Sequence, residues 1–348
     1  MENRLLLAFV LSLGVFVGWG YFLAQVQGPL PVKEPGMEDV PVDAQALPPR
    51  APGSTPSVLP QSNSVQPVTP IPIPANPFPG EEVLIQVSTG KSHFVISNRG
   101  GVLKQLELPR FKNDSGDIID LINNPDHLTP ALALRANDPE ITSILQNAHY
   151  EASTTSIVLD ESIPEGKLTL TLNHSSGIKV TRTYVFHYND FMVELDTQIS
   201  APSLAARNLQ YDVVLGPGMG GKIASQTDYI VFSGATVFVN NERIENPPED
   251  IHDTVYYKGD LKWAAFQNKY FGSALIPQQG TKAGLVLKEK DQTFVGLEFE
   301  SVQSSASAQF MFYAGTKELE ILENKGHHLV RMIDYGWFGN KFAFLVKP

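Results

Sequence analysis

The feature that most constrains the fold of this sequence is an alternation of hydrophobic and polar residues between positions 165 and 195. The hydrophobic members of the alternation are Leu168, Leu170, Leu172, Ile178, Val180, Tyr184, Phe186, Tyr188, Phe191, Val193 and Leu195. Because side chains two residues apart lie on the same face of a β-strand, this spacing predicts strands with one buried face. Ser176-Gly177 and Asn189-Asp190 divide the stretch into a predicted three-stranded meander, interrupted on its apolar face only by Arg182.

Short stretches of the same kind recur along residues 81–316. They are Val83–Ser88, Phe94–Ser97, Leu106–Leu108, Tyr211–Leu215, Tyr229–Phe232, Thr236–Val239, Gly284–Leu287, Phe294–Phe299 and Ala308–Tyr313. Helical periodicity is scarce before Lys317. Many short strands separated by turn signals predict a mainly β fold with one large β-sandwich over residues 81–316, rather than several small domains.

The first 24 residues are predicted to form a transmembrane anchor. Leu5–Ala24 is a run of 20 residues without a charge, long enough to span a bilayer as a helix. Its apolar and aromatic anchor residues include Leu5, Phe9, Phe16, Trp19 and Tyr21. The alternative is a cleaved signal peptide, which the bulky Phe22 in Phe22-Leu23-Ala24 disfavours. Since Arg4 precedes the segment and no basic residue follows before Lys33, we expect a cytoplasmic N-terminus and a main domain on the other side.

Residues 25–80 are predicted to be a disordered linker. They contain 15 of the 26 prolines, together with many Ser, Val and Gln residues. Proline lacks the backbone donor that helices and strands need, so the segment should form an extended tether. A proline-rich ligand for a recognition domain is the alternative, and an inert spacer is favoured over it.

The composition excludes several classes of function. With 26 basic and 37 acidic residues, the formal net charge is −11, which disfavours nucleic-acid binding. The absence of cysteine removes disulfides, cysteine-ligated zinc and cysteine nucleophiles. The eight histidines are scattered without a metal-binding spacing, and His327-His328 is expected to cap or solvate a helix end. No G-x-S-x-G motif occurs. We therefore expect no catalytic residues, no metal and no cofactor.

A glycine-rich stretch, Gly216 to Lys222, fits the phosphate-loop pattern G-x-x-x-x-G-K. However, Ile223 stands where the Ser or Thr that holds Mg²⁺ is required, and the sequence that follows is strand-like rather than helical. Without a helix N-terminus the loop lacks the backbone donors that bind phosphate. We interpret the stretch as a strand exit whose glycines need positive φ.

Two aromatic stretches remain. Leu261–Pro277 contains Trp263, Phe266, Tyr270 and Phe271, which we interpret as part of the core rather than as a partner surface. Residues 317–348 are predicted to form connecting helices, with a break at Gly326, that lead to the start of a membrane-embedded region. The side chains expected at the membrane interface are Trp337, Phe338, Lys341, Phe342 and Leu345. A buried C-terminal helix of the sandwich is the alternative.

The order of these segments resembles the YidC membrane protein insertase family of Gram-negative bacteria. The stretches that carry the resemblance are MENRLLLAFVLS, VISNRGGVLKQLEL, WAAFQNKYFGSALIP, FYAGTKELEIL and MIDYGWFGNKFAFLVKP. The residues that match the family motifs are Trp263, Phe266, Tyr270, Phe271, Asp334, Tyr335 and Gly336. The resemblance implies a periplasmic β-supersandwich similar to galactose mutarotases and carbohydrate-binding domains.

The resemblance also implies a function without catalytic turnover. Members of the family help nascent inner-membrane proteins enter the lipid bilayer, fold and assemble, alone or with the Sec translocon and its SecD and SecF subunits. Their insertion groove lies in membrane spans that follow the periplasmic domain, and this sequence ends at Pro348, where the next span is expected to begin. Two other functions remain open: a membrane-anchored carbohydrate-binding or mutarotase-like protein, marked by a His/Glu pair in a cleft, and a scaffold that docks onto the translocon.

Overall fold

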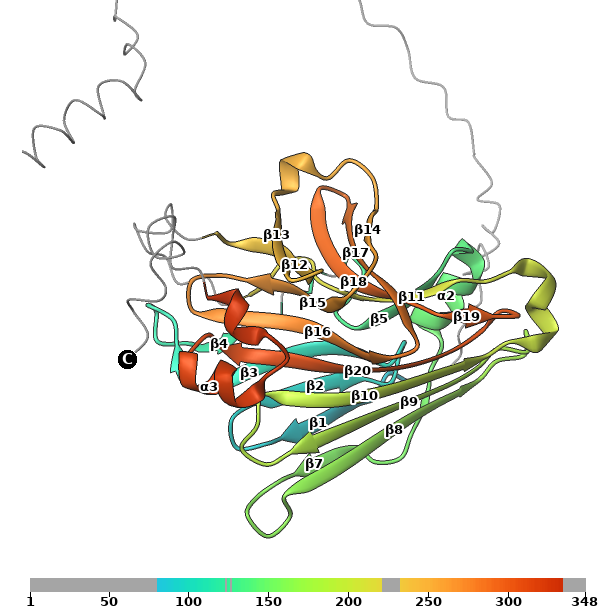
Figure 1. Cartoon of the computed structure of the whole chain (residues 1–348). Helices are drawn as coiled ribbons and strands as arrows, with labels where there is room; N and C mark the ends of the chain where they lie inside the picture. The colour runs from blue at the N-terminus through green and yellow to red at the C-terminus, as the bar shows by residue number, and fades with distance from the viewer. Residues whose placement is uncertain (1–79, 123, 126, 221–231, 334–348) are drawn as a thin grey trace, which may run out of the picture. The chain divides into compact units, whose positions relative to one another are not determined.

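A computed structural model of the chain describes residues 80–122, 124–125, 127–220 and 232–333 (Figure 1). It is a mainly β sandwich, as predicted. The predicted anchor, most of the linker and residues 334–348 lie outside the described residues, as does most of the predicted strand Tyr229–Phe232. Among the residues described, no helix is long and apolar enough to cross a membrane.

The strands form three sheets. The first has the order β4 (Ile118–Asp120), β3 (Val102–Lys112), β2 (His93–Ser97), β1 (Leu84–Ser88) and β7 (Ser156–Val158). The second, ten-stranded sheet runs β13 (Glu242–Asn246), β12 (Gly234–Val239), β15 (Leu261–Gln267), β16 (Phe271–Gln279), β20 (Ser305–Thr316), β10 (Met192–Ser200), β9 (Lys179–His187), β8 (Glu165–Asn173) and β6 (Glu151–Ala152), with β19 (Ser301–Val302) beside β20. The third runs β14 (Val255–Tyr257), β17 (Thr281–Glu289), β18 (Gln292–Phe299), β11 (Tyr211–Leu215) and β5 (Ala133–Ala136).

The predicted meander is β8, β9 and β10. Leu168 pairs with Tyr184, and Tyr184 pairs with Leu195, so the alternating residues of the three strands share one face. These three side chains are at most 3% exposed. The period-two pattern therefore identified both the strands and the face that they bury.

Arg182 lies on this buried face and is fully inaccessible to solvent. Its Nη1 donates to the carbonyl oxygen of Gly101 at 2.7 Å, and its guanidinium lies 5.4 Å from the ring centroid of Tyr184. The Tyr184 hydroxyl donates to the same carbonyl at 2.8 Å. A polar residue in an apolar row is thus used to tie β9 to the turn before β3.

Both smaller sheets pack on the same face of the ten-stranded sheet. Phe94 of β2 meets Phe186 of β9 edge-on, with 5.3 Å between ring centroids, and Phe299 of β18 lies 6.1 Å from Phe310 of β20. The strand registers place Phe186 and Phe310 on one face of the ten-stranded sheet. Its other face, called the outer face below, is therefore left for the remaining elements.

One helix was not predicted from the sequence. α2 spans Pro139–Asn147, where Asp138 caps the helix by accepting hydrogen bonds from the backbone N–H groups of Glu140 and Ile141. The apolar residues of this short helix at positions 141, 144 and 145 are all buried. A nine-residue segment offers too few turns for a helical period to stand out, although its capping aspartate and first-turn proline are recognised start signals. Three short 3₁₀ helices complete the fold: η1 (Pro202–Arg207), η2 (Pro248–Asp250) and η3 (Leu329–Met332).

Candidate functional site: the C-terminal cover of the ten-stranded sheet

Two short helices at the end of the described chain lie on the outer face. After β20 ends at Thr316, α3 spans Leu319–Lys325 and η3 follows at Leu329–Met332. Figure 1 shows α3 in red beside one end of β20. We call residues 319–333 the C-terminal cover. It is the part of the sandwich from which the chain continues toward the predicted interfacial segment.

The cover forms where helical spacing predicted connecting helices. Leu322 and Leu329 are fully buried, whereas Leu319 is 39% exposed. Gly326 has a φ of 68° and ends α3, so the predicted break is confirmed. The connecting helices are therefore not free in solvent, because their apolar side chains complete the core.

His327 and His328 form the link between the two helices. Both have left-handed backbone conformations, with φ of 50° and 59°. The carbonyl oxygen of His328 accepts hydrogen bonds from the backbone N–H of Arg331 at 2.9 Å and from Trp263 Nε1 at 3.4 Å. His328 directly precedes η3, in agreement with the expected place at a helix end.

An aromatic stack lies beneath this link. Trp263 of β15 and Phe238 of β12 are cross-strand partners whose ring centroids are 5.5 Å apart. The ring of His328 lies 5.6 Å from that of Phe238. Trp263 and Phe238 are at most 1% exposed. The stack thus joins the centre of the sheet to the cover.

The four aromatic residues of Leu261–Pro277 have different environments. Trp263, Phe266 and Phe271 are at most 2% exposed, as the core interpretation predicted. Tyr270 is 40% exposed in the turn between β15 and β16, so the core interpretation is wrong for it. A turn reverses the chain at the edge of the sheet and leaves no second layer to cover the ring. The motif residues Asp334, Tyr335 and Gly336, and the predicted interfacial residues, lie outside the described residues.

Polar contacts hold both ends of the cover. Lys325 Nζ lies 2.5 Å from Asp190 Oδ2 in the turn between β9 and β10. Just before the cover, the backbone N–H of Lys317 donates to the carbonyl of Tyr270 at 2.7 Å. Burial raises the pKa of the Tyr313 hydroxyl nearby, with further contributions from Glu318 and Asp190, so this group stays a neutral donor to the carbonyl of Thr316.

The Lys325–Asp190 pair should contribute measurably to stability. Its side chains are only 27% and 19% exposed, so Lys325→Ala leaves a largely buried carboxylate without its cation. We expect a loss of about 1–2 kcal/mol in the free energy of unfolding, measured by circular dichroism in urea. The exposed lysine of β8 provides the control, since Lys167→Ala should cost less than about 0.5 kcal/mol. Equal losses in the two variants would show that the pair is not coupled to folding.

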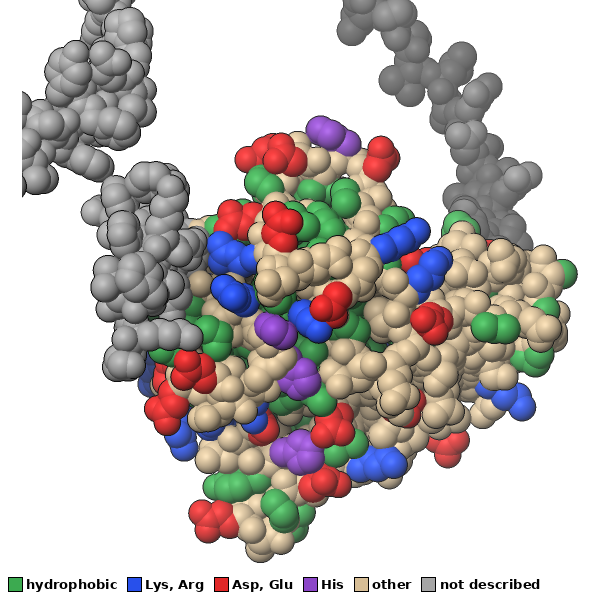
Figure 2. All heavy atoms as spheres, in the orientation of Figure 1, with side chains coloured by type: hydrophobic (Ala, Val, Ile, Leu, Met, Phe, Trp, Pro, Cys, Tyr) green, Lys and Arg blue, Asp and Glu red, His purple; other side chains and the backbone are tan. Residues whose placement is uncertain are grey.

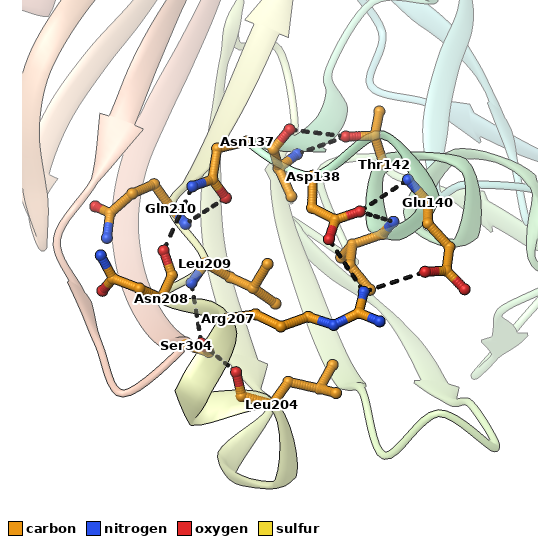
Figure 3. Close-up of polar contacts among 12 residues, drawn as sticks. Asn137, Asp138, Glu140, Thr142, Leu204, Arg207, Asn208, Leu209, Gln210 and Ser304 are labelled. Carbon is orange, nitrogen blue, oxygen red and sulfur yellow. Dashed lines mark hydrogen bonds and ion pairs between the residues drawn. The ribbon is translucent and has the colours of Figure 1, made fainter.

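A second polar cluster, drawn in Figure 3, joins α2, η1 and the β19–β20 turn. Arg207 Nη1 lies 3.0 Å from Asp138 Oδ2 and 3.1 Å from Glu140 Oε2. Ser304 Oγ accepts from the backbone N–H of Leu209 at 2.9 Å and donates to the carbonyl of Leu204 at 2.8 Å. These groups satisfy one another, so the cluster is best explained as a latch that fixes η1.

The glycine-rich stretch behaves as a strand exit. It follows β11 directly, and Gly216 and Gly218 have φ of 144° and 65°. A side chain at Gly220 would meet the carbonyl oxygen of Asp120 at 2.3 Å. The close approach of the backbone to neighbouring strands explains these glycines as packing residues. Gly221 and Lys222 lie outside the described residues.

A histidine does meet carboxylates, but on an exposed part of the sheet. His187 Nε2 lies 3.2 Å from Glu194 Oε1, and His187 Nδ1 lies 3.9 Å from Glu165 Oε2. The three side chains are 34%, 54% and 64% exposed. Acidic and basic side chains are interspersed on the face that Figure 2 shows. Among the residues described, no group of three or more His, Cys, Asp or Glu side chains is arranged to hold a metal ion.

The family model for the YidC periplasmic domain matches residues 84–348. The chain belongs to this family. Relatives named "Membrane protein insertase YidC" include those of Pelobacter propionicus, 24% identical over 364 residues, and Geobacter metallireducens, 25% identical over 359 residues. Each alignment covers 100% of this chain and 62% of the relative. The chain therefore spans less than two thirds of the length of these YidC proteins, which are named as insertases rather than as enzymes.

Solved structures with similar folds include sugar-modifying proteins. A galactose mutarotase-like protein from Lactobacillus casei aligns with a TM-score of 0.43 and 9% identity, covering 67% of this chain and 99% of its own. A putative aldose 1-epimerase from Escherichia coli aligns with a TM-score of 0.37 and 9% identity, covering 68% and 100%.

Proposed function

We propose that this chain is the anchor and periplasmic part of an inner-membrane protein insertase. In this role it helps to insert, fold and assemble inner-membrane proteins, alone or with the Sec translocon and its SecD and SecF subunits. The observation that carries the proposal is the family match over residues 84–348, together with relatives named membrane protein insertase.

The C-terminal cover supports this role physically. Because Leu322, Leu329 and Met332 are fully buried, the chain leaves the sandwich at a defined place after Ile333. The segment that follows is predicted to lie at the membrane interface through Trp337, Phe338 and Phe342. A packed connection of this kind transmits the position of the sandwich to the membrane segment better than a loose linker does.

Labelling of single cysteines tests the proposed location. The chain has no cysteine, so Val302→Cys, at a side chain 73% exposed, provides a single reactive site. A membrane-impermeant maleimide should label it in cells whose outer membrane alone is permeabilised. Glu2→Cys, on the predicted cytoplasmic side, should react only after the inner membrane is opened. Labelling of Glu2→Cys before that step would contradict the proposed topology.

The reading frame beyond codon 348 at the native locus tests the insertase role. Five further hydrophobic spans in frame would support it, because the relatives are longer than this chain. An in-frame stop would contradict insertase activity for this product. Translocon cooperation has its own test: Sec subunits should co-purify with the protein, and recovery should fall when residues 81–316 are deleted.

A further inference from the structure

A row of small residues crosses four strands of the outer face. Gly234 of β12 pairs with Gln267 of β15, Gln267 pairs with Gly272 of β16, and Gly272 pairs with Gly315 of β20. We call these four residues the glycine row. The strand registers place it on the same face as Trp263, beneath the C-terminal cover.

Large apolar side chains lie directly over the three glycines. A Cβ added to Gly234 would lie 3.0 Å from the ring of Phe232, and one added to Gly272 would lie 2.9 Å from Met332 Sδ. A Cβ at Gly315 would lie 2.6 Å from the ring of Phe191. The row therefore already accommodates apolar side chains from chain segments that pass across it.

Gln267 is the exception within the row. Its side chain is 1% exposed, yet neither Nε2 nor Oε1 has a hydrogen-bond partner among the described residues. The hydroxyl of Thr236, diagonally across on β12, is likewise buried and without a partner. Burying an amide without partners costs the full desolvation penalty of its donor and its acceptor. An amide in this state is prepared for a ligand that offers one acceptor and one donor.

We propose that the glycine row binds an apolar segment of a polypeptide, with Gln267 hydrogen-bonded to one of its peptide units. A peptide unit offers one C=O and one N–H, which match the two unpartnered atoms of Gln267. The walls of the site are Phe232, Trp263 and Met332, which suit apolar side chains of the same segment. Met332 gives way on binding, because methionine is unbranched and adapts to irregular spaces.

This inference rests on the proposed function, since the ligand class is that of a client membrane segment. It adds a place on the sandwich where such a segment is held and a residue that recognises its backbone. A carbohydrate is disfavoured because hydroxyl-rich ligands need several polar partners, and the surroundings of Gln267 are largely apolar.

Photo-crosslinking tests the site. The probe is a 20-residue Leu/Ala peptide with a photoreactive leucine at its centre, added to the full chain in detergent micelles. Crosslinks mapped by mass spectrometry should fall in Leu261–Gln279 or Leu329–Met332. Gln267→Met should lower the crosslinking yield about three- to ten-fold, the equivalent of one lost hydrogen bond, while raising the midpoint of thermal unfolding. Gln267→Leu serves as a second apolar variant should the first not fold.

Thr197→Val is the matched control. Thr197 is also fully buried with an unpartnered hydroxyl, but it lies on β10 and points to the inner face. This variant should crosslink as the unchanged protein does. Equal yields for Gln267→Met and the unchanged protein, or crosslinks confined to β8 and β9, would overturn the proposal. So would an oligosaccharide that raises the unfolding midpoint in a Gln267-dependent way.

The proposed function fails by a different result. An in-frame stop after codon 348 would contradict the insertase role even if the peptide binds at Gln267. Conversely, a locus that encodes the further spans would leave that role intact even if no crosslink reaches the glycine row.

Discussion

Replacing Trp263 with alanine should lower the free energy of unfolding by about 3–5 kcal/mol. The indole is fully buried, stacks on Phe238 at 5.5 Å and donates to the carbonyl of His328 at 3.4 Å. Its removal leaves a cavity beneath the C-terminal cover that the surrounding strands cannot close. Urea unfolding followed by circular dichroism measures the loss.

The control for this prediction comes from the same aromatic stretch. Tyr270 is 40% exposed and contacts Lys269 through its ring face, 5.1 Å from Nζ. Tyr270→Ala should therefore cost less than about 1 kcal/mol. In Trp263→Ala, hydrogen exchange at Leu329 to Ile333 should also accelerate, because the cover loses its aromatic support. Equal losses for the two variants would contradict the division of this motif into core and turn.

Substituting Gly280 with alanine should destabilise the protein by roughly 2–5 kcal/mol. Gly280 lies in the turn between β16 and β17 with a φ of 68°, and an added Cβ would lie 1.8 Å from the carbonyl oxygen of Ser307. The left-handed conformation alone costs about 1–2 kcal/mol for a residue with a side chain. The clash adds about 1–3 kcal/mol, because the opposing atom belongs to the backbone of β20 and cannot rotate away.

Gly326 separates these two contributions. It has the same φ of 68°, but no atom lies within 4 Å of an added Cβ. Gly326→Ala should therefore show only the conformational cost of about 1–2 kcal/mol, with unfolding measured in the same way. If both alanine variants lose the same stability, the close approach to Ser307 is relieved by a movement of the strands.

The sequence predicted the elements whose pattern is local and repeated. Alternation identified β8, β9 and β10 together with their buried face, because a strand exposes the same face at every second residue. It was less informative where a segment is short, and α2 was missed although Asp138 and Pro139 signalled its start. The resemblance of ordered motifs identified the family, which a match over residues 84–348 then showed.

The candidate site depended on contacts that no local pattern contains. The environments of Trp263 and Tyr270 differ although they are seven residues apart, since one lies at the centre of a sheet and the other in its turn. Gln267 looks like an ordinary polar strand residue in the sequence. Only the register of four strands places it between glycines, and only the packing of Met332 and Phe232 over those glycines buries its amide.

The sequence by itself thus determined the strand class, the buried face of the meander, the break at Gly326 and the family. Tertiary structure alone decided that the connecting helices become a cover, that both smaller sheets share one face, and that the opposite face keeps an unpartnered amide. The physical reason is the range of the interactions. Alternation and turn residues act over a few positions, whereas burial is set by residues such as Gly272 and Met332, which are distant along the chain and meet only after the sheet has formed.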